Sequence, residues 1–251
     1  MRVRLLVHIL FASFIAALLA VPVTAQAKHP FTFEDMMKLK RVGEPVPSPD
    51  GKWVLFSAVD VDLAANKKTP HIWIVPLAGG QERALISDQD GNRPRWAPDG
   101  KRFAFISNKE GGSQVWIADF DGAGGTVTGV HKLTSIATEA GGELWSPDGK
   151  NILFTSDVYP ECDGAPEAEA DCNAKKMKEL ENSKVKALIF DRLLYRHWNA
   201  YKSGRRGHIF ARLVPSMGLQ PDGFLLNGLS LSLLRDLTPG DYDSQIGRAH
   251  V

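Results

Sequence analysis

Two cysteines, Cys162 and Cys172, are the residues whose type and spacing most directly indicate chemistry in this 251-residue chain. They lie ten positions apart in a stretch rich in Asp, Glu, Pro and Ala. Such a pair of cysteines can form a disulfide, bind a metal ion or provide a reactive thiol. A metal site would need histidines or further cysteines close in sequence, and none is there. In an oxidising compartment we expect a disulfide, whose short loop would contribute about 2–3 kcal/mol.

The sequence holds no recognisable catalytic or ligand-binding motif. Residues 111–115 and 228–232 approach the G-x-S-x-G nucleophile elbow, and each lacks the last glycine. A P-loop, an H-E-x-x-H motif and a dinucleotide fingerprint are absent, and the seven histidines have no partner at catalytic or ligand spacing. Residues 88–91 and 119–122 faintly resemble calcium loops without the rest of that pattern, so we interpret both as turns. We therefore predict no catalytic residue, no cofactor and no metal.

The first 27 residues are typical of a secretory signal peptide. Arg2 and Arg4 precede an apolar run that ends at Ala20, and Ala25-Gln26-Ala27 is a small-x-small cleavage site. The run is shorter than the ~20 residues of a membrane-spanning helix, so we expect cleavage after Ala27 rather than an anchor. The mature chain is then periplasmic or secreted, with no membrane association beyond export.

The composition indicates a globular protein with many turns. Apolar residues make up 43% and charged residues 24%, which excludes wholesale disorder. Lys+Arg 30 against Asp+Glu 29 gives a net charge of +1, without the basic character of a nucleic-acid binder. Gly 23 and Pro 15 are more than usual and favour many short strands.

An internal repeat predicts the fold. The segments SPDGKWVLFS, APDGKRFAFI and SPDGKNILFT recur every 49 positions. Each begins with a tight turn, because Pro presets φ, Asp bonds its own backbone and Gly adopts a positive φ. A strand follows each turn, and four short strands per period of this length are typical of a propeller blade. The predicted fold is all-β, a partial β-propeller of four-stranded blades. The turn residues are Pro49, Asp50, Gly51, Pro98, Asp99, Gly100, Pro147, Asp148 and Gly149.

The repeat also sets the predicted domain limits. We expect the incomplete propeller over 28–243, with blades near 44–96, 97–145 and 146–243. Trp96 and Trp145 stand just before two of the turns and are expected to pack between blades. A short helix capped by Thr32 precedes the first blade, and its buried face would come from Met36, Met37, Leu39 and Val42.

The third period is longer than the others. We expect an insertion over 157–186 that holds both cysteines and then a helix from 173 to 186. A strand is predicted over 186–195, and residues 215–233 fit no blade pattern. The segment 246–251 can be encoded by the start of a common sequencing-adapter oligonucleotide, so we expect 244–251 to be non-native and the natural protein to be longer.

Several segments together resemble one enzyme family. They are the opening helix FTFEDMMKLKRVGEPVPSPDGKWVLFS, the SPDGK turns, the cysteine-bearing DVYPEC…DCN insertion, DRLLYRHWNAYKSGRRGHIF and RDLTPGDYD. With them the chain resembles, over most of 31–243, the N-terminal propeller of secreted bacterial serine peptidases of the prolyl oligopeptidase family, in the acylaminoacyl-peptidase or dipeptidyl-aminopeptidase-like branch. TolB-like propellers share the SPDGK turns, so the DRLLYRHW segment with the cysteine insertion is the specific part.

The resemblance implies a function for the parent protein. In such enzymes a propeller of about seven blades caps an α/β-hydrolase domain and admits short peptides. The chain would be the substrate-gating part of an exported serine peptidase, with short peptides as substrates. No position matches the catalytic triad motifs, so the chain alone is expected to be inactive. The alternatives are a non-enzymatic periplasmic TolB-like propeller that binds a protein partner and, less favoured, a propeller-based polysaccharide lyase. The sequence predicts no oligomeric state.

Overall fold

A computed structural model describes residues 29–185, 187, 189–190, 196–197, 200–201, 203–214, 225–226, 229–230 and 234–244. The predicted signal peptide, residues 245–251 and most of 215–233 lie outside the described residues. The chain divides into two compact units, Met1–Lys38 and Leu39–Val251. Among the described helices, none combines the length and the hydropathy of a membrane span.

The described part of the first unit is a short helix, α2 (Phe33–Lys38). The Asp35 N–H donates to the Thr32 hydroxyl at 3.2 Å, and the Thr32 N–H donates back to the Asp35 carboxylate at 3.1 Å. This reciprocal cap explains why the helix begins here. The predicted buried face is wrong, because no residue of α2 is buried and Met36, Leu39 and Val42 are exposed. A helix of 6 residues has fewer than two turns and forms no continuous apolar stripe.

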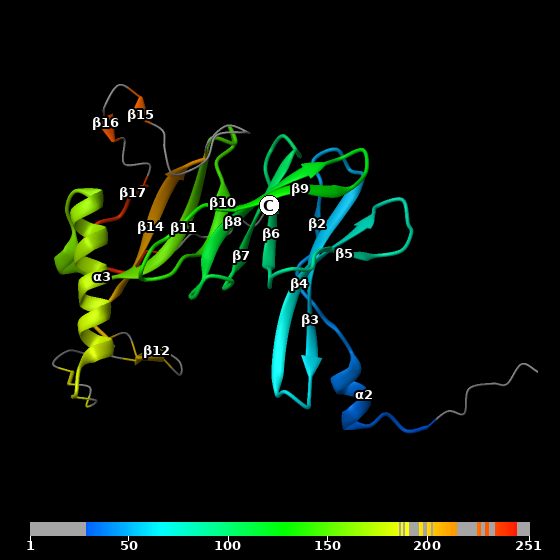
Figure 1. Ribbon diagram of the computed structural model, residues 1–251, viewed down its shortest axis with the longest axis horizontal. Helices are drawn as coiled ribbons and strands as arrows, with labels where there is room; N and C mark the ends of the chain where they lie inside the picture. The colour runs from blue at the N-terminus through cyan, green and yellow to red at the C-terminus, as the bar shows by residue number, and fades with distance from the viewer. Residues whose placement is uncertain are drawn as a thin grey trace, which may run out of the picture. The chain divides into compact units, whose positions relative to one another are not determined.

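Three antiparallel sheets follow one another along the second unit (Figure 1). The first blade consists of β1 (Arg41–Val42), β2 (Val46–Pro47), β3 (Trp53–Asp62), β4 (Lys67–Pro76) and β5 (Arg83–Ile86). The second blade consists of β6 (Asn92–Trp96), β7 (Arg102–Ser107), β8 (Gln114–Asp121) and β9 (Thr126–Lys132). The third blade consists of β10 (Gly141–Trp145), β11 (Asn151–Val158), β14 (Arg206–Leu213) and β17 (Leu234–Asp236). Two small hairpins pair β12 (Arg196–His197) with β13 (Ala200–Tyr201), and β15 (Leu225–Leu226) with β16 (Leu229–Ser230).

The sheets confirm the predicted all-β fold of propeller-like blades. The blade limits differ from those predicted at 44–96, 97–145 and 146–243, because β6 pairs with β7 and β10 pairs with β11. Each Pro-Asp-Gly turn is the loop of a hairpin, and the two strands of a hairpin belong to one sheet. The strand before each turn therefore opens the blade that follows it.

The three repeat turns share one geometry. Gly51, Gly100 and Gly149 have φ of 68°, 67° and 69°, which favours glycine. The Ser48 and Ser146 hydroxyls donate to the aspartates two positions on, at 2.6 and 2.5 Å, and hold the pKa of Asp50 and Asp148 below its usual value. Successive turns also stack, since a Cβ on Gly100 would lie 3.5 Å from the Pro49 ring and one on Gly149 3.6 Å from Pro98.

The second blade is buried on both faces because alternate side chains of its strands enter two different cores. Phe103 and Phe105 of β7 pack with Leu55 and Ile72 of the first blade. Ala104 and Ile106 pack instead with residues of the third blade, including Ile152, Phe154 and Phe210. The period of two along β7 therefore places one residue in each core in turn.

Two tryptophans link neighbouring blades, as predicted. The indole N–H of Trp96 donates to the carbonyl of Val46 in the first blade at 3.0 Å. The indole N–H of Trp145 donates to the carbonyl of Arg95 in the second blade, also at 3.0 Å. The same contact therefore recurs with the repeat, and it joins the strands that precede the Pro-Asp-Gly turns of successive blades.

The insertion of the third blade differs in its limits from the prediction. Asp157 and Val158 still pair with β14, so the insertion begins after β11 with the short helix η1 (Pro160–Cys162). The main helix is α3 (Pro166–Asn182), not 173–186. Pro at the first turn and the acidic Glu167 and Glu169 near its N-terminus favour the earlier start. Of the strand predicted over 186–195, the structure describes Ala187, Ile189 and Phe190, and none of these is in a strand.

Candidate functional site

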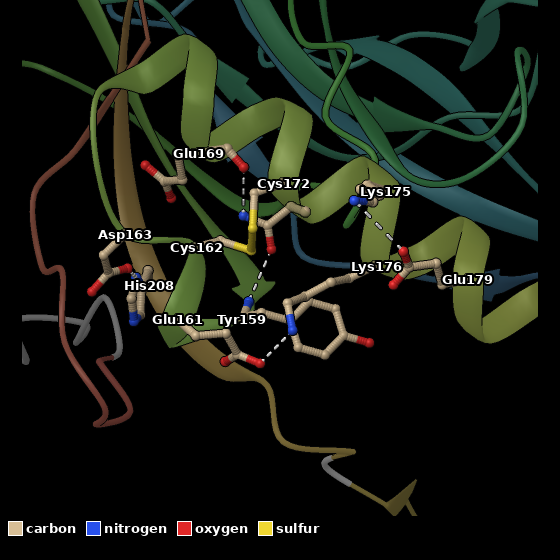
Figure 2. The surroundings of a disulfide bond; sticks show 11 residues. Tyr159, Glu161, Cys162, Asp163, Glu169, Cys172, Lys175, Lys176, Glu179 and His208 are labelled. Carbon is tan, nitrogen blue, oxygen red and sulfur yellow. Dashed lines mark hydrogen bonds and ion pairs between the residues drawn. A yellow bond between two sulfur atoms is a disulfide. The ribbon is translucent and has the colours of Figure 1, made fainter.

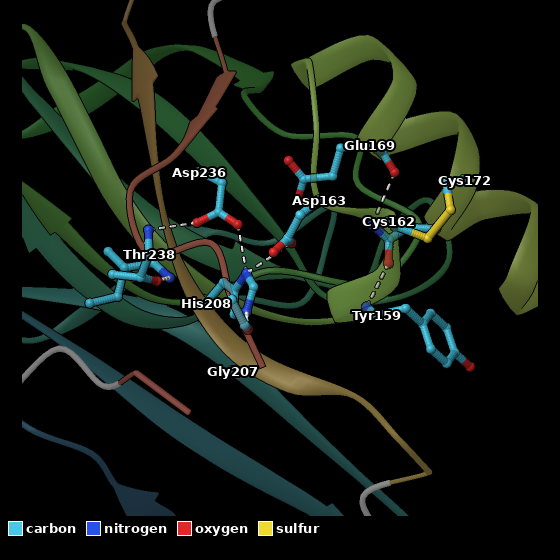
Figure 3. Close-up of polar contacts among 12 residues, drawn as sticks. Tyr159, Cys162, Asp163, Glu169, Cys172, Gly207, His208, Asp236 and Thr238 are labelled. Atoms are coloured by element: carbon cyan, nitrogen blue, oxygen red, sulfur yellow. Dashed lines mark hydrogen bonds and ion pairs between the residues drawn. A yellow bond between two sulfur atoms is a disulfide. The ribbon is translucent and has the colours of Figure 1, made fainter. Parts of the chain in front are cut away.

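A group of acidic side chains and one histidine lies where the insertion meets the third blade. It consists of Asp163 after η1, Glu169 of α3, His208 of β14 and Asp236 of β17. One nitrogen or oxygen atom from each residue lies within 4.8 Å of the others. Figure 3 shows the three carboxylates directed toward the imidazole.

The register of the third blade brings His208 and Asp236 together. Phe210 pairs with Asp236 across β14 and β17, which places Asp236 diagonally opposite His208 on the same face. The His208 side chain is fully buried. Its Nδ1 lies 2.6 Å from Asp236 Oδ2 and 4.0 Å from Asp163 Oδ1.

The other imidazole nitrogen fixes the orientation of the ring. His208 Nε2 lies 2.9 Å from the carbonyl oxygen of Gly240. A carbonyl only accepts hydrogen bonds, so Nε2 carries a proton and Nδ1 faces the carboxylates. Asp236 is held from its other side, because its Oδ1 accepts the Thr238 N–H at 2.8 Å.

Glu169 is the least compensated member of the group. It is 5% exposed, and its Oε1 has no hydrogen-bond partner. Burial raises the pKa of Glu169 to about 7, and the carboxylates of Asp236 and Asp163 raise it further while His208 opposes them. A buried carboxylate with negative neighbours favours either a proton or a cation.

A disulfide anchors the segment that carries two of these carboxylates (Figure 2). Cys162 of η1 is bonded to Cys172 of α3, with Cα atoms 5.5 Å apart. The Asn173 side chain donates to the Glu169 carbonyl at 3.0 Å and accepts the Tyr159 N–H at 2.9 Å. The bridge and the asparagine therefore hold Asp163 and Glu169 against the blade.

A second polar feature consists of charged residues of β6 and β10 and of Glu44, which precedes β2. Arg95 of β6 pairs with Glu44 at 2.7 Å, and Arg93 Nε lies 3.9 Å from Glu143 of β10. Glu143 is 2% exposed, and neither carboxylate oxygen has a hydrogen-bond partner. Burial raises the pKa of Glu143 to about 7, against the opposing effect of Arg93 and Arg95.

The predicted turn residues belong to neither of these two polar features. The disulfide of Cys162 and Cys172 lies beside the His208 group. Of the two calcium-like segments predicted to be turns, residues 88–91 form a bend between β5 and β6, whereas residues 119–121 are the end of β8 and the turn begins at Gly122. Asp90 accepts from the Ser107 hydroxyl at 2.8 Å, and Asp121 accepts the Ala123 and Gly124 N–H groups at 3.1 Å each.

The His208 group could not be recognised from the sequence because His208 and Asp236 lie 28 positions apart. Spacing along the chain therefore could not indicate the partner that His208 has in the fold. The repeat contained a usable signal. Val115 N–H donates to Thr134 at 2.9 Å in the second blade, and Ile209 N–H donates to Thr238 at 2.9 Å in the third. Aligning the two blades would have placed Asp236 beside His208.

Known proteins resemble the chain in sequence and in fold. No protein-family model matches it. It is 33% identical over 174 residues to dipeptidyl-peptidase 5 of Porphyromonas gingivalis, covering 68% of this chain and 23% of that protein. It is 30% identical over 167 residues to the uncharacterized peptidase YuxL of Bacillus subtilis, covering 66% and 24%. The chain thus spans about a quarter of the length of these curated relatives.

Two solved structures share the fold. The AtxE2 isopeptidase superposes with a TM-score of 0.52 at 16% identity, covering 85% of this chain and 33% of that one. The acylaminoacyl peptidase of Pyrococcus horikoshii gives 0.50 at 17% identity, covering 73% and 24%. The chain is thus a propeller-like domain of the kind found in peptidases. It belongs to the prolyl oligopeptidase family and corresponds to the N-terminal, propeller-like region of its members.

Proposed function

We propose that the chain is the substrate-gating propeller portion of an exported serine peptidase that cleaves short peptides. The observation that carries this proposal is the 33% identity to dipeptidyl-peptidase 5 over 174 residues, since the matched protein is named for releasing dipeptides. In the parent enzyme the blades would cover the entrance to a catalytic hydrolase domain and admit only short peptides.

Two features of the blades suit a gate. Neighbouring blades are joined by buried hydrogen-bonded groups, such as Trp145 with the Arg95 carbonyl, so the relative position of the blades around a substrate entrance is fixed. Glu44, before β2, and Arg93 of β6 have side chains that are 49% exposed, so both are available to contact the polar backbone or termini of a passing peptide.

Export is part of the same proposal. The leader-like residues 1–27 and the cysteine pair both suit an oxidising compartment outside the cytoplasm. Fractionation of cells that produce the natural protein should place it in the periplasm or the medium, with residues 1–27 removed. A cytoplasmic protein that keeps its leader would contradict the export part alone.

The gating role is tested on the complete natural gene product. The genomic reading frame is followed past codon 243, and its product is assayed with a dipeptidyl chromogenic amide and with a long unstructured protein that begins with the same dipeptide. We expect a serine nucleophile elbow downstream and a large preference in kcat/KM for the short substrate. The 251-residue chain by itself should show no turnover, because the sequence offers no activated nucleophile and oxyanion hole.

The variants Trp145→Phe and Trp116→Phe separate gating from general damage. Trp145 donates to a neighbouring blade, whereas the Trp116 indole N–H has no hydrogen-bond partner. Loosening the blade contact should raise cleavage of the long substrate relative to the short one in Trp145→Phe only. Equal preference for both substrates in the wild type would overturn gating, and a frame with no hydrolase motifs would favour the TolB-like alternative.

A further inference from the structure

We propose that Asp163, Glu169, His208 and Asp236 form a binding site for one divalent cation of the Zn²⁺ or Mn²⁺ class. The site joins the disulfide-bearing insertion to two strands of the third blade. Figure 3 shows the four side chains converging from the loop after η1, from α3, from β14 and from β17.

The distances suit a single ion. Zn²⁺ bonds to imidazole nitrogen and carboxylate oxygen are about 2.0–2.2 Å long, so two ligands on opposite sides of one ion lie at most ~4.4 Å apart. The four candidate atoms already lie within 4.8 Å of one another. Ligand atoms around a tetrahedral ion lie about 3.3–3.6 Å apart, so binding would draw the farther pairs together by about an ångström and separate His208 Nδ1 from Asp236 Oδ2, which now lie 2.6 Å apart. Asp163, whose side chain is 26% exposed, is on the solvent side where the ion can enter.

The hydrogen bond of His208 prepares it as a ligand. Its Nε2–H donates to the Gly240 carbonyl at 2.9 Å, which fixes the proton on that nitrogen. Nδ1 then faces the carboxylates and shares a proton with Asp236 Oδ2 at 2.6 Å, and an ion bound at Nδ1 would replace that proton. Metal-binding histidines generally have such an outer partner, which sets the tautomer and the ring orientation.

Glu169 independently indicates a missing positive charge. The residue is 5% exposed, Oε1 has no hydrogen-bond partner, and one of its two carboxylate oxygens lies within 4.8 Å of the other three candidate ligand atoms. Among the described residues, the charges that act on Glu169 are Asp163, Asp236 and His208. One imidazole cannot compensate three carboxylates, and a divalent cation in their midst would supply both the charge and the missing partner.

The mixed donor set narrows the kind of ion. Carboxylates alone suit Ca²⁺, Mg²⁺ and Mn²⁺, whereas imidazole suits Zn²⁺ and other late metals. One imidazole with three carboxylates therefore favours Zn²⁺ or Mn²⁺ over Ca²⁺ and Mg²⁺. Its role would be structural, since ligands from the insertion and from the blade are joined through one ion.

The test uses the full chain, oxidised and stripped of metal by a chelator. Titration calorimetry with ZnCl₂, MnCl₂, CaCl₂ and MgCl₂ should show one site per chain for Zn²⁺ or Mn²⁺, and the same ion should raise Tm. Glu169→Gln should weaken binding at least ~10-fold, by the scale of losses seen at metal sites. Glu167→Gln, on the exposed face of the same helix, is the matched control and should bind as the wild type does.

A spectroscopic readout guards against a folding artefact. In ¹⁵N spectra of the imidazoles, saturating Zn²⁺ should shift the Nδ1 resonance of His208 and leave its Nε2 in the protonated range. The proposal is overturned if no divalent cation binds, if Ca²⁺ or Mg²⁺ alone binds, if Glu169→Gln binds like the wild type, or if Nδ1 does not respond.

Discussion

Replacing Glu143 by Gln should make the folded chain more stable at pH 8 while leaving it nearly unchanged at pH 4.5. The carboxyl is 2% exposed, neither oxygen has a hydrogen-bond partner, and burial raises its pKa from 4.5 to about 7. Glutamine has almost the same shape as the protonated acid and never ionises, so it isolates the effect of the charge.

The sign follows from the two protonation states. Below pH 4.5 the carboxyl is neutral in both the folded and the unfolded chain. As the pH rises toward about 7, the unfolded chain releases the proton while the folded chain keeps it, so the free energy of unfolding falls. The contribution is fully present below the unfolded pKa and is lost once the pH passes the folded pKa. At about 1.4 kcal/mol per tenfold change, this residue accounts for a loss of roughly 3 kcal/mol.

The assay is urea denaturation of wild type and Glu143→Gln at half-unit steps from pH 4.5 to 8.5. The difference in unfolding free energy should grow from near zero to about 3 kcal/mol, with most of the rise before pH 7. The exposed Glu82→Gln controls for removing one negative charge and should give a small, nearly constant difference. Parallel curves for wild type and Glu143→Gln would refute the reasoning, because the ionisation of Glu143 would then be the same in both states.

Three further predictions concern the repeat and the insertion. Trp145→Phe should lower the free energy of unfolding by about 1–3 kcal/mol, because the Arg95 carbonyl loses its hydrogen-bond donor. The indole N–H of Trp116 has no partner, so Trp116→Phe should cost clearly less in the same denaturant titration. Equal losses in the two variants would refute the blade-linking role of Trp145. Gly100→Ala should lower the free energy of unfolding by about 1–2 kcal/mol, because φ of Gly100 is 67°. A Cβ on Gly141 would meet no atom within 4 Å, so Gly141→Ala should be neutral or slightly stabilising. A neutral Gly100→Ala would contradict the turn geometry. In protein exported to the periplasm, mass spectrometry without reduction should find Cys162 and Cys172 linked, and free thiols at both positions would sink that expectation.

The elements that local chemistry determines were predictable. The Pro-Asp-Gly turns and the strands after them follow from residue preferences over a few positions, and the 49-residue period indicated blades. The start of α3 was missed because Pro166 and its acidic neighbours suit a turn as well as a first helical turn. Local sequence decides such cases poorly when the packing partner is far away.

The His208 group and the buried Glu143 could not be predicted from the sequence, for a different reason. His208 and Asp236 meet through the pairing of β14 with β17, which is known only once the strand order of the third blade is known. Glu143 sits in a segment that favours a surface glutamate, and its burial arises where β10 lies beside β6 of the preceding blade. Both are products of tertiary contacts rather than of residue preferences.

The double-sided burial of the second blade has a consequence for how the domain melts. In the described part of the chain, the core that holds Leu55 and the core that holds Phe154 are both lined by β7 and β8. If either outer blade unfolds, one face of β7 and β8 is exposed to solvent. The core on their other face is then destabilised too, because the same two strands form part of it. The three blades should therefore unfold as one cooperative unit whose weakest outer blade sets the melting temperature, as in a short nearest-neighbour array with a common middle element.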